Sequence, residues 1–574
     1  MCRLTFWNYQ LKNYIYWGII TSVNELPGMC DTPVILNLQI LFGNLISLSI
    51  MPGRPVSGWL HIRLRIPTWL RQESKGRKRH SGNDMIAVRL AVGCRPAAFL
   101  WYRKFVKFSA TYIIKAFRVR CAFLFCIGVH TMKQDLTQGN ILKTMLIFAF
   151  PMMIGNMLQQ LYNVVDTLIV GQFLGADALA AVGSSYTLMT FLTSILLGLC
   201  MGSGTMFSIC YGKKDFTYLK SCMFVSFLSI AVLTIVLNTA VFAGLDKILI
   251  LLQVPARISA DMRDYLWVVF WGIAASFLYN YFASLLRAVG NSVVPLLFLG
   301  ASALLNIVLD LIFILVFHWG VTGAAAATVF SQYVSGIGIM LYTLVHFPEF
   351  RPKGRDCRWN GRAARDIFSL SFLTCIQQSV MNFGILMVQG RVNSFGASVM
   401  AAFAAAVKID SFAYMPVQDF GNAFSTFIAQ NYGAGKRERM EKSIRSAVKT
   451  VVLFCIVITA GVCIFAEPLM LIFVKPDETE ILITGIRYLR IEGAFYWGIG
   501  LLFLFYGLYR AVKKPGISVV LTVISLGTRV LLAYILSSIP AVGVNGIWVS
   551  IPVGWMLADI TGFCYYLLRK ERLL

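Results

Sequence analysis

The chain has 574 residues, of which 58% are hydrophobic and 13% charged, and its mean hydropathy is +0.71. This composition excludes an ordinary soluble domain, in which about a quarter of the residues are charged. The formal net charge is +25, but residues 1–131 hold 18 of the 51 basic and 4 of the 26 acidic residues, a net +14. The remaining net charge of +11 lies in short loops between apolar stretches. Basic residues in such loops set the orientation of a protein in the membrane. We therefore expect a bilayer protein with no nucleic-acid partner.

Residues 1–131 form an atypical basic segment. Their apolar stretches Ile35–Ile50 and Ala97–Val129 are too irregular for clean membrane spans, and the order of charged, apolar and small residues of a signal peptide is missing. Met132 then begins a short polar leader directly before a strong span. We expect translation to start at Met132; an appended basic domain is the alternative.

From Met132 onward, windows of about 19 residues identify twelve apolar spans. In the first half they cover 142–168, 182–209, 219–243, 263–287, 294–318 and 322–346. In the second half they cover 366–390, 403–430, 446–466, 485–510, 517–538 and 545–568. We therefore expect an N-lobe over 132–346, a polar cytoplasmic linker over 347–365 and a C-lobe over 366–574.

The two halves repeat one another. Arg287-Ala288-Val289 recurs as Arg510-Ala511-Val512, and Tyr265-Leu266 recurs at the same offset as Tyr488-Leu489. Upstream, Tyr211-Gly212 recurs as Tyr432-Gly433 at a slightly shorter offset. A largely apolar, head-to-tail duplication of this kind is typical of two-lobed membrane transporters.

Loop charges orient the spans. Basic residues gather in alternate loops, such as 213–220 and 436–445, whereas the opposite loops are short or acidic. Both termini and the linker are therefore expected in the cytoplasm. Six spans return the chain to the same side, so the halves are parallel repeats. The predicted fold is an all-α membrane protein, twelve transmembrane helices in two six-helix repeats, located in the cell membrane.

Ionisable and amide side chains inside the spans are the candidate functional residues, because a charge in hydrocarbon is costly unless it faces a cavity or a partner. Asp166 lies in the first span on the same helix face as Gln159 and Asn163. Asp310 lies in the fifth span, four residues after Asn306. Thr328 lies in the sixth span. Helix capping or an interhelical hydrogen bond is the structural alternative for both carboxylates.

The second half carries Lys408, Asp410, Glu492 and Arg529 in its spans, but its positions matching Asp166 and Asp310 are the Gln389 region and Ala533. The sequence therefore predicts a carboxylate pair in the first half alone. Arg287 and Arg510 are interpreted as anchors at the cytoplasmic ends of their spans. Lys408 is left open between a cavity and a structural position. The 13 Cys and five His show no metal-ligand spacing, so neither a metal nor another cofactor is expected.

Several motifs resemble the multidrug and toxic compound extrusion (MATE) family over 132–574. They are Phe150-Pro151, Gln160–Thr167, Val170-Gly171, Gly175–Gly183, Leu286–Asn291 and Gly320–Ala325. The positions of Asp166, Asn306, Asp310 and Thr328 resemble the N-lobe cation network of the DinF-like branch. The seventh span, Gln377 to Arg391, lacks the acidic residue of the NorM-like branch.

The resemblance implies a monomeric, cation-coupled antiporter that exports small organic cations or amphiphilic drugs. The missing acidic residue favours proton over sodium coupling, through the N-lobe. Candidate cavity-lining residues are Gln159, Tyr162, Asn163, Lys408 and Glu492. The alternative is a lipid-linked oligosaccharide flippase, which requires a cationic cavity that only Arg529, Lys408 and Arg391 could supply. A membrane-embedded enzyme is disfavoured, because no metal-binding carboxylate pair or Ser/His set is found.

Overall fold

The computed structural model describes residues 35–40, 44–50, 62–64, 134–251, 254, 256–351, 354 and 358–573. The chain divides into two compact units, Met1–Ile127 and Gly128–Leu574. In the first unit, β1 (Ile35–Ile40), β2 (Asn44–Ile50) and β3 (Ile62–Leu64) form an antiparallel sheet in the order β1-β2-β3. The apolar stretch Ile35–Ile50 therefore contains two paired strands. The stretch Ala97–Val129 lies outside the described residues, and translation from Met132 stays a prediction.

The second unit is helical. Its first half consists of α3 (Ile141–Leu174), α4 (Ala176–Gly212), α5 (Phe216–Leu251), α6 (Ala256–Val269), α7 (Gly272–Ala288), α8 (Val293–Leu311) with the π-helical turn η3 (Ile312–Val316), and α9 (Gly320–His346). The short 3-10 helix η4 (Pro348–Phe350) follows. Its second half consists of α10 (Gly361–Asn393), α11 (Ala397–Gly433), α12 (Arg437–Ile464), α13 (Ala466–Met470), α14 (Thr479–Gly493), α15 (Tyr496–Ala511), α16 (Pro515–Ser537) and α17 (Asn545–Leu573).

The twelve expected spans are confirmed. In the described part of the chain, ten helices are long and apolar enough to cross a bilayer, and two bent pairs bring the number to twelve. The bent pairs are α6–α7, with a 45° bend, and α14–α15, with a 51° bend. Both are the fourth span of their half, and their breaks occupy matching positions of the repeat. The duplication has therefore preserved a broken helix as well as the span order.

The expected linker 347–365 is shorter in the structure, because α10 already begins at Gly361. The Asn360 side chain caps this helix and accepts hydrogen bonds from the backbone N–H groups of Arg362 and Ala363. An asparagine cap satisfies amide groups that the first helical turn leaves without partners. The polar, basic sequence that suggested a linker therefore includes the first turn of a long helix.

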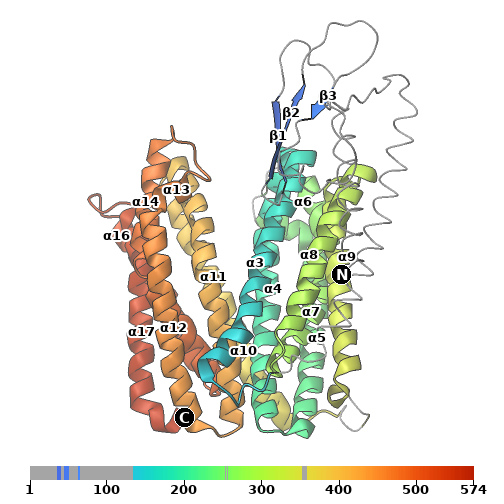
Figure 1. The fold of residues 1–574 in the computed structure, drawn as a ribbon, viewed down its shortest axis with the longest axis vertical. Coiled ribbons are helices and arrows are strands. Elements are labelled where there is room, and N and C mark those ends of the chain that lie inside the picture. The colour runs from blue at the N-terminus through green and yellow to red at the C-terminus, as the bar shows by residue number, and fades with distance from the viewer. Residues whose placement is uncertain are drawn as a thin grey trace, which may run out of the picture. The chain divides into compact units, whose positions relative to one another are not determined.

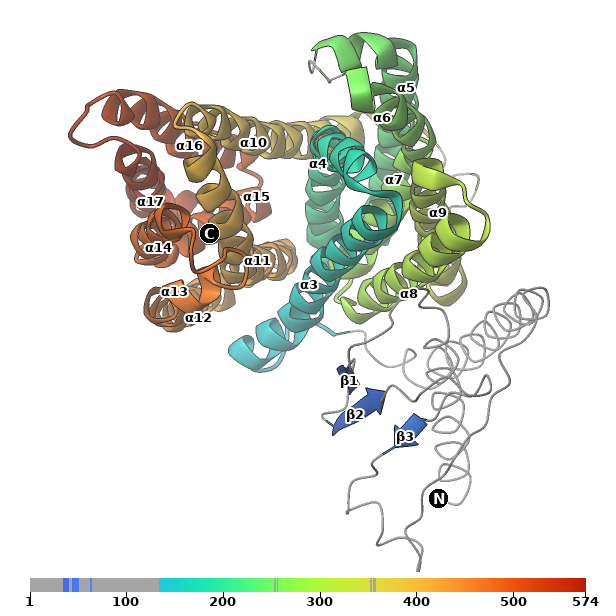
Figure 2. The same cartoon turned by 90° about the horizontal axis from the view of Figure 1, so that it is seen from above.

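The helices form two bundles, α3–α9 and α10–α17, which we call the N-lobe and the C-lobe (Figures 1 and 2). One hydrophobic cluster fills the C-lobe and extends onto α3, and a second fills the N-lobe and extends onto the start of α10. In the C-lobe, the Trp548 ring stacks on Phe403 and meets Tyr488 edge-on. In the N-lobe, Tyr281 packs edge-on against Phe227. Both buried clusters therefore continue across the boundary between the lobes.

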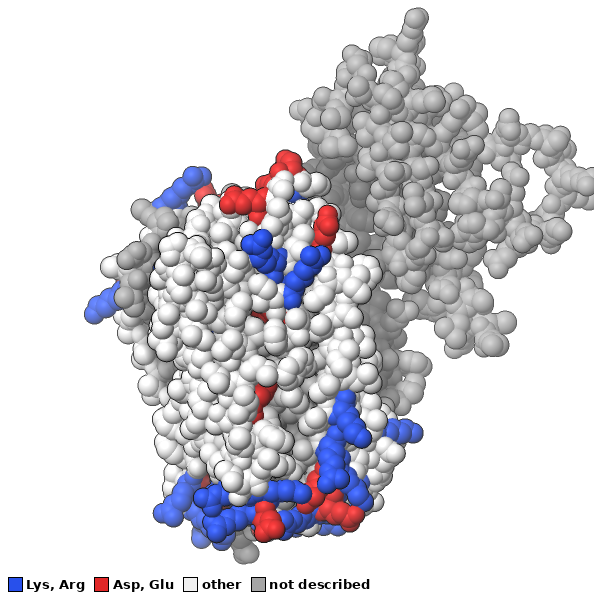
Figure 3. Space-filling view, turned by 90° about the vertical axis from the view of Figure 1, so that its left-hand side faces the viewer, with Lys and Arg blue, Asp and Glu red and all other residues white. Residues whose placement is uncertain are grey.

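Lys and Arg side chains gather at one end of the second unit (Figure 3). We call this the basic end; it carries the α4–α5 loop with Lys213 and Lys214, and the α11–α12 loop with Lys436. The belt between the two ends is nearly bare of charged side chains on the face shown in Figure 3. An uncharged belt between charged ends matches the hydrocarbon core and headgroup layers of a bilayer.

The lobes contact each other at the basic end. There α4 and α11 cross so closely that a Cβ at Gly212 would collide with the carbonyl oxygen of Gln430, and a Cβ at Gly433 with that of Ile209. The Gln430 side chain also donates a 2.7 Å hydrogen bond to the backbone oxygen of Ala288. The ribbons of the two lobes diverge toward the end that carries α6 and α13 (Figure 1). The structure is therefore closed at the basic end.

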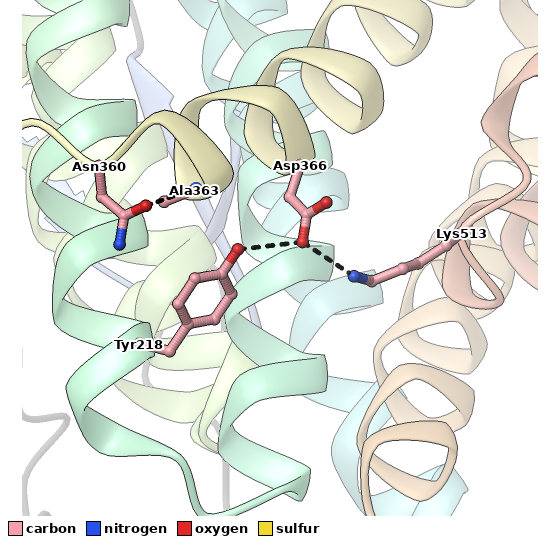
Figure 4. A network of polar contacts seen from close by, with 5 residues as sticks. All are labelled: Tyr218, Asn360, Ala363, Asp366 and Lys513. Atoms are coloured by element: carbon pink, nitrogen blue, oxygen red, sulfur yellow. Dashed lines mark hydrogen bonds and ion pairs between the residues drawn. The ribbon is translucent and has the colours of Figure 1, made fainter.

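A polar network reinforces this closure (Figure 4). The Asp366 carboxylate on α10 accepts a 3.1 Å hydrogen bond from the Tyr218 hydroxyl on α5 of the N-lobe. The same oxygen lies 3.1 Å from the Lys513 ammonium, which follows α15 of the C-lobe. One carboxylate thus joins groups from both lobes, so opening at the basic end has to break one of these contacts.

We predict that Gly433→Ala lowers the thermal stability of the purified protein. The added methyl group has no room against the Ile209 carbonyl, and overpacking of this kind costs about 1–3 kcal/mol. Gly461→Ala on α12 is the matched control, since a Cβ there meets no atom within 4 Å. Melting curves should show an apparent melting temperature lower by about 2–8 °C for Gly433→Ala only. Equal curves for both variants would contradict a tight crossing.

Candidate functional site

The N-lobe holds a cluster of polar side chains from three helices: Asp166 on α3, Asn306 and Asp310 on α8, and Thr328 on α9. Asp310 is 0% exposed. The Asn306 amide donates a 3.3 Å hydrogen bond to the Thr328 hydroxyl, and the carboxyl groups of Asp166 and Asp310 lie in contact. We call these four residues the N-lobe cluster. The structure thus brings together the four residues that the sequence singled out for cation coupling.

Local helix geometry builds this cluster. Asn306 and Asp310 are four residues apart on α8, so they project from one face toward α3 and α9, which both pack on that helix. The π-helical turn η3 follows one residue after Asp310. Such turns disrupt regular helix bonding and occur often at functional sites.

Several oxygens of the cluster lack hydrogen-bond donors. Both carboxylate oxygens of Asp310, one of Asp166 and the amide oxygen of Asn306 are buried and accept no hydrogen bond from the described residues. A carboxylate is only an acceptor, so two carboxylates in contact need a shared proton or a bound cation between them. In apolar surroundings that requirement is strong. The donor set therefore fits a proton or a small monovalent cation. Nowhere in the described chain do three His, Cys, Asp or Glu side chains come together as a metal site.

Two tyrosines border the N-lobe cluster. Tyr162 on α3 and Tyr265 on α6 both lie near enough to Asp166 and Asp310 to interact electrostatically, and the Tyr162 hydroxyl contacts Gln159. Tyr162 was expected to line a cavity, whereas the sequence did not mark Tyr265 as a site residue. The feature of the sequence that distinguishes Tyr265 is that it belongs to the Tyr-Leu pair repeated in both halves.

The other candidate cavity-lining residues lie apart. Gln159 is exposed and Asn163 half-buried on α3. Lys408 is exposed on α11, three helical turns from Asp419 and on the same face. Asp419 accepts a hydrogen bond from Asn156 of α3, so this face of α11, with Lys408, is directed toward the N-lobe. Glu492, by contrast, is buried inside the C-lobe.

A second carboxylate pair exists in the C-lobe, where the sequence analysis expected none. Asp410 on α11 and Glu492 on α14 are both buried and interact electrostatically with each other and with Arg529 on α16. Their partners include tyrosines, Tyr496 for Asp410 and Tyr488 for Glu492. The sequence placed all three charges in spans but could not show that three separate helices bring them together.

The repeat relates the two clusters. At the offset that relates Arg287 to Arg510, Tyr265 matches Tyr488 and Asn306 matches Arg529. Each lobe therefore has a tyrosine at the same place beside its carboxylates. The neutral amide of the N-lobe, however, is replaced by a guanidinium in the C-lobe. The C-lobe pair has a permanent internal cation, and the N-lobe pair has none among the described residues.

Known proteins with similar sequences were compared with the chain. The MatE family model matches residues 151–312 and 371–535. The probable multidrug resistance protein YpnP of Bacillus subtilis is 31% identical over 436 residues, which cover 75% of this chain and 96% of YpnP. The multidrug export protein MepA of Staphylococcus aureus is 24% identical over 442 residues, covering 75% of this chain and 95% of MepA.

Solved structures show the same fold. A MOP superfamily transporter from Pyrococcus furiosus, whose report describes a binding pocket of reversed polarity, has a TM-score of 0.73. It is 24% identical, and the match covers 77% of this chain and 99% of that one. An outward-facing multidrug resistance MATE family transporter has a TM-score of 0.72 with the same identity and coverage. The two-lobe, twelve-span architecture is therefore shared with these proteins.

We predict that Arg529→Gln destabilises the protein by about 1–3 kcal/mol, because it removes the positive charge that acts on the two buried carboxylates Asp410 and Glu492. Adding Glu492→Gln to that variant should restore most of the loss, since only one carboxylate then remains. Thermal melts of the two single variants and the double variant provide the double-mutant cycle. Arg257→Gln, which removes an exposed ion pair with Asp177, is the control and should cost under about 1 kcal/mol. A double variant no more stable than Arg529→Gln would refute charge compensation.

Proposed function

Because the chain belongs to the MatE family of membrane transporters, we propose that it exports organic cations and amphiphilic drugs in exchange for protons. The relatives named above are described as multidrug resistance or export proteins, and the chain matches about their whole length. We place the protein in the cell membrane as a monomer, with the basic end and both termini in the cytoplasm. No further cofactor is required for this exchange.

The observation that carries the coupling proposal is the contact between Asp166 and Asp310 without an internal cation. Two such carboxylates attract either a proton or a cationic substrate, and one ligand reduces the attraction for the other. That competition is the requirement for antiport. In the C-lobe, Arg529 permanently provides the positive charge that the carboxylates attract. The N-lobe cluster is therefore favoured as the place where the exchanged cation binds.

The proposed cycle starts from the conformation described above, closed at the basic end. A proton from outside neutralises the Asp166–Asp310 pair and weakens its hold on a cationic drug, which leaves outward. Pro151, Gly155 and Gly171 on α3 provide places where this helix can bend as the charge on Asp166 changes. Return of the empty, protonated N-lobe to the cytoplasmic side then completes the exchange.

The flippase alternative gains no support from the placement of its three basic residues. Arg391 donates hydrogen bonds to Ser537 and Ser538, and Arg529 faces the C-lobe carboxylates. Lys408 lies on the exposed face of α11. Each has a separate environment, whereas diphosphate recognition would require them to converge.

We predict that Asp166→Asn and Asp310→Asn each abolish proton-driven drug efflux, because an amide can neither take up nor release the coupling proton. The measurement is export of a fluorescent cationic drug from energised membrane vesicles. Asp246→Asn is the matched control, since this carboxylate is exposed and pairs with Arg263 at the surface. Both amide variants should insert and melt like the parent protein. Undiminished efflux by either one would remove that carboxylate from the coupling role.

The coupling ion can be identified in proteoliposomes. We expect an imposed proton gradient to drive drug uptake at equal sodium on both sides, and a sodium gradient at equal pH to drive none. The physical reason is that two carboxylates in contact titrate as a pair that shares one proton, so proton binding needs no ligand beyond Asp166 and Asp310. Uptake driven by sodium alone would show that the proton assignment is wrong.

A further inference from the structure

A small cavity lies between the lobes, away from both carboxylate clusters. It has a volume of about 20 Å³ and is walled by α4 of the N-lobe and by α10, α11 and α15 of the C-lobe. The lining residues that matter here are Met201, Gln377, Gln378, Gln418, Asn422 and Arg510. A space of this size accommodates about one water molecule or one monatomic ion.

Arg510 brings a positive charge to this cavity. Its side chain is only 4% exposed. Its guanidinium donates to the Asn422 amide oxygen at 3.0 Å and to the Ser425 hydroxyl at 3.4 Å, and both acceptors are neutral. Within the described ranges no carboxylate forms an ion pair with Arg510. A buried charge without a counter-ion is unfavourable, so an anion in contact with it would be stabilised.

The amide groups around the cavity also lack protein partners. Gln377 is 2% exposed and Gln378 is 9% exposed. No hydrogen bond within the described part of the chain involves the side chain of Gln377, Gln378 or Gln418. Gln418 is half-buried. Buried polar side chains are nearly always hydrogen-bonded, so Gln377 and Gln378 are expected to bind something inside the cavity that they line. Amide N–H groups beside a guanidinium are donors that suit an anion.

The repeat explains why the charge is unpaired. Arg510 matches Arg287, which interacts electrostatically with the Asp419 carboxylate on α11 of the opposite lobe, although the two side chains are not in direct contact. At the offset that relates Tyr211 to Tyr432, Asp419 matches Gly198 on α4. A Cβ at Gly198 would collide with the backbone of Cys375, so this position has no room for an acidic side chain. The contact between the lobes therefore has a carboxylate that acts on Arg287, whereas no carboxylate among the described residues does the same for Arg510.

We infer that this cavity is a binding site for a small inorganic anion of the halide class, held by Arg510 and the amides of Gln377 and Gln378. The anion supplies at this crossing the negative charge that Asp419 supplies at the other. Because α4 belongs to the N-lobe and the remaining walls to the C-lobe, the bound anion stabilises the contact between the lobes. The site is independent of the proposed drug export.

The test is thermal unfolding of the purified full chain in sodium chloride, sodium bromide or sodium gluconate at constant ionic strength and pH. Chloride and bromide should raise the melting temperature along a saturable curve, whereas gluconate, too large for the cavity, should not. Identical melting temperatures in all three salts would overturn the inference. Stabilisation by sodium acetate but not by chloride would also overturn it, since the cavity would then accept a carboxylate group.

Two variants localise the effect. Arg510→Gln should abolish the halide dependence, and Gln378→Leu should weaken the apparent halide affinity by about tenfold, the value of one hydrogen bond to a charged group. Arg287→Gln is the matched control and should retain the halide dependence of the parent protein, because its own partner is Asp419. Full halide dependence in Gln378→Leu and Arg510→Gln would place the anion elsewhere. If Arg510→Gln fails to fold, Gln378→Leu still decides.

Discussion

Neutralising charge inside the bilayer is the constraint on which this structure depends. A carboxylate or guanidinium among apolar helices costs several kcal/mol unless another charge compensates it. The protein meets this cost in different ways. Asp410 and Glu492 have Arg529 within the C-lobe, and Asp419 has Arg287 across the lobe contact. On the proposals made above, ligands from solution compensate the N-lobe pair and Arg510, so binding at those places can change the protein's state.

Helix α3 connects the coupling cluster to the lobe contact. It carries Asp166, and ten residues earlier Asn156, whose amide donates to Asp419 of the C-lobe. Ten residues of helix span about 15 Å, and the proposed bend points Gly155 and Gly171 lie outside this stretch, so the two groups move together when α3 bends. A change of charge at Asp166 therefore acts on a helix that also holds the lobes together. This physical link gives alternating access a route from proton binding to lobe movement.

Sequence alone was sufficient for the span order, because apolar length and composition are local properties of each helix. It also identified Asn306 and Asp310 as neighbours, since their four-residue spacing fixes one helix face. It did not predict the C-lobe pair of Asp410 and Glu492, which come from α11 and α14. The first half has no carboxylate at the matching positions of the repeat. The early start of α10 was missed because its first turn is as polar as a loop. Contacts between separate helices depend on how the helices pack, and the spacing of residues within one helix does not predict that packing.

The two lobes differ in the charges around their carboxylate pairs, and this difference affects how each lobe would respond to protonation. If both lobes kept a carboxylate pair without an internal cation, both would change charge during transport, and the lobe contact would respond to two uncoordinated events. Arg529, the counterpart of Asn306, keeps a positive charge beside the C-lobe carboxylates throughout the cycle. In the proposed mechanism the C-lobe therefore keeps its state, while protonation alters the N-lobe. In that mechanism only the N-lobe binds and releases a cation, so the two halves of the duplicated fold have different roles.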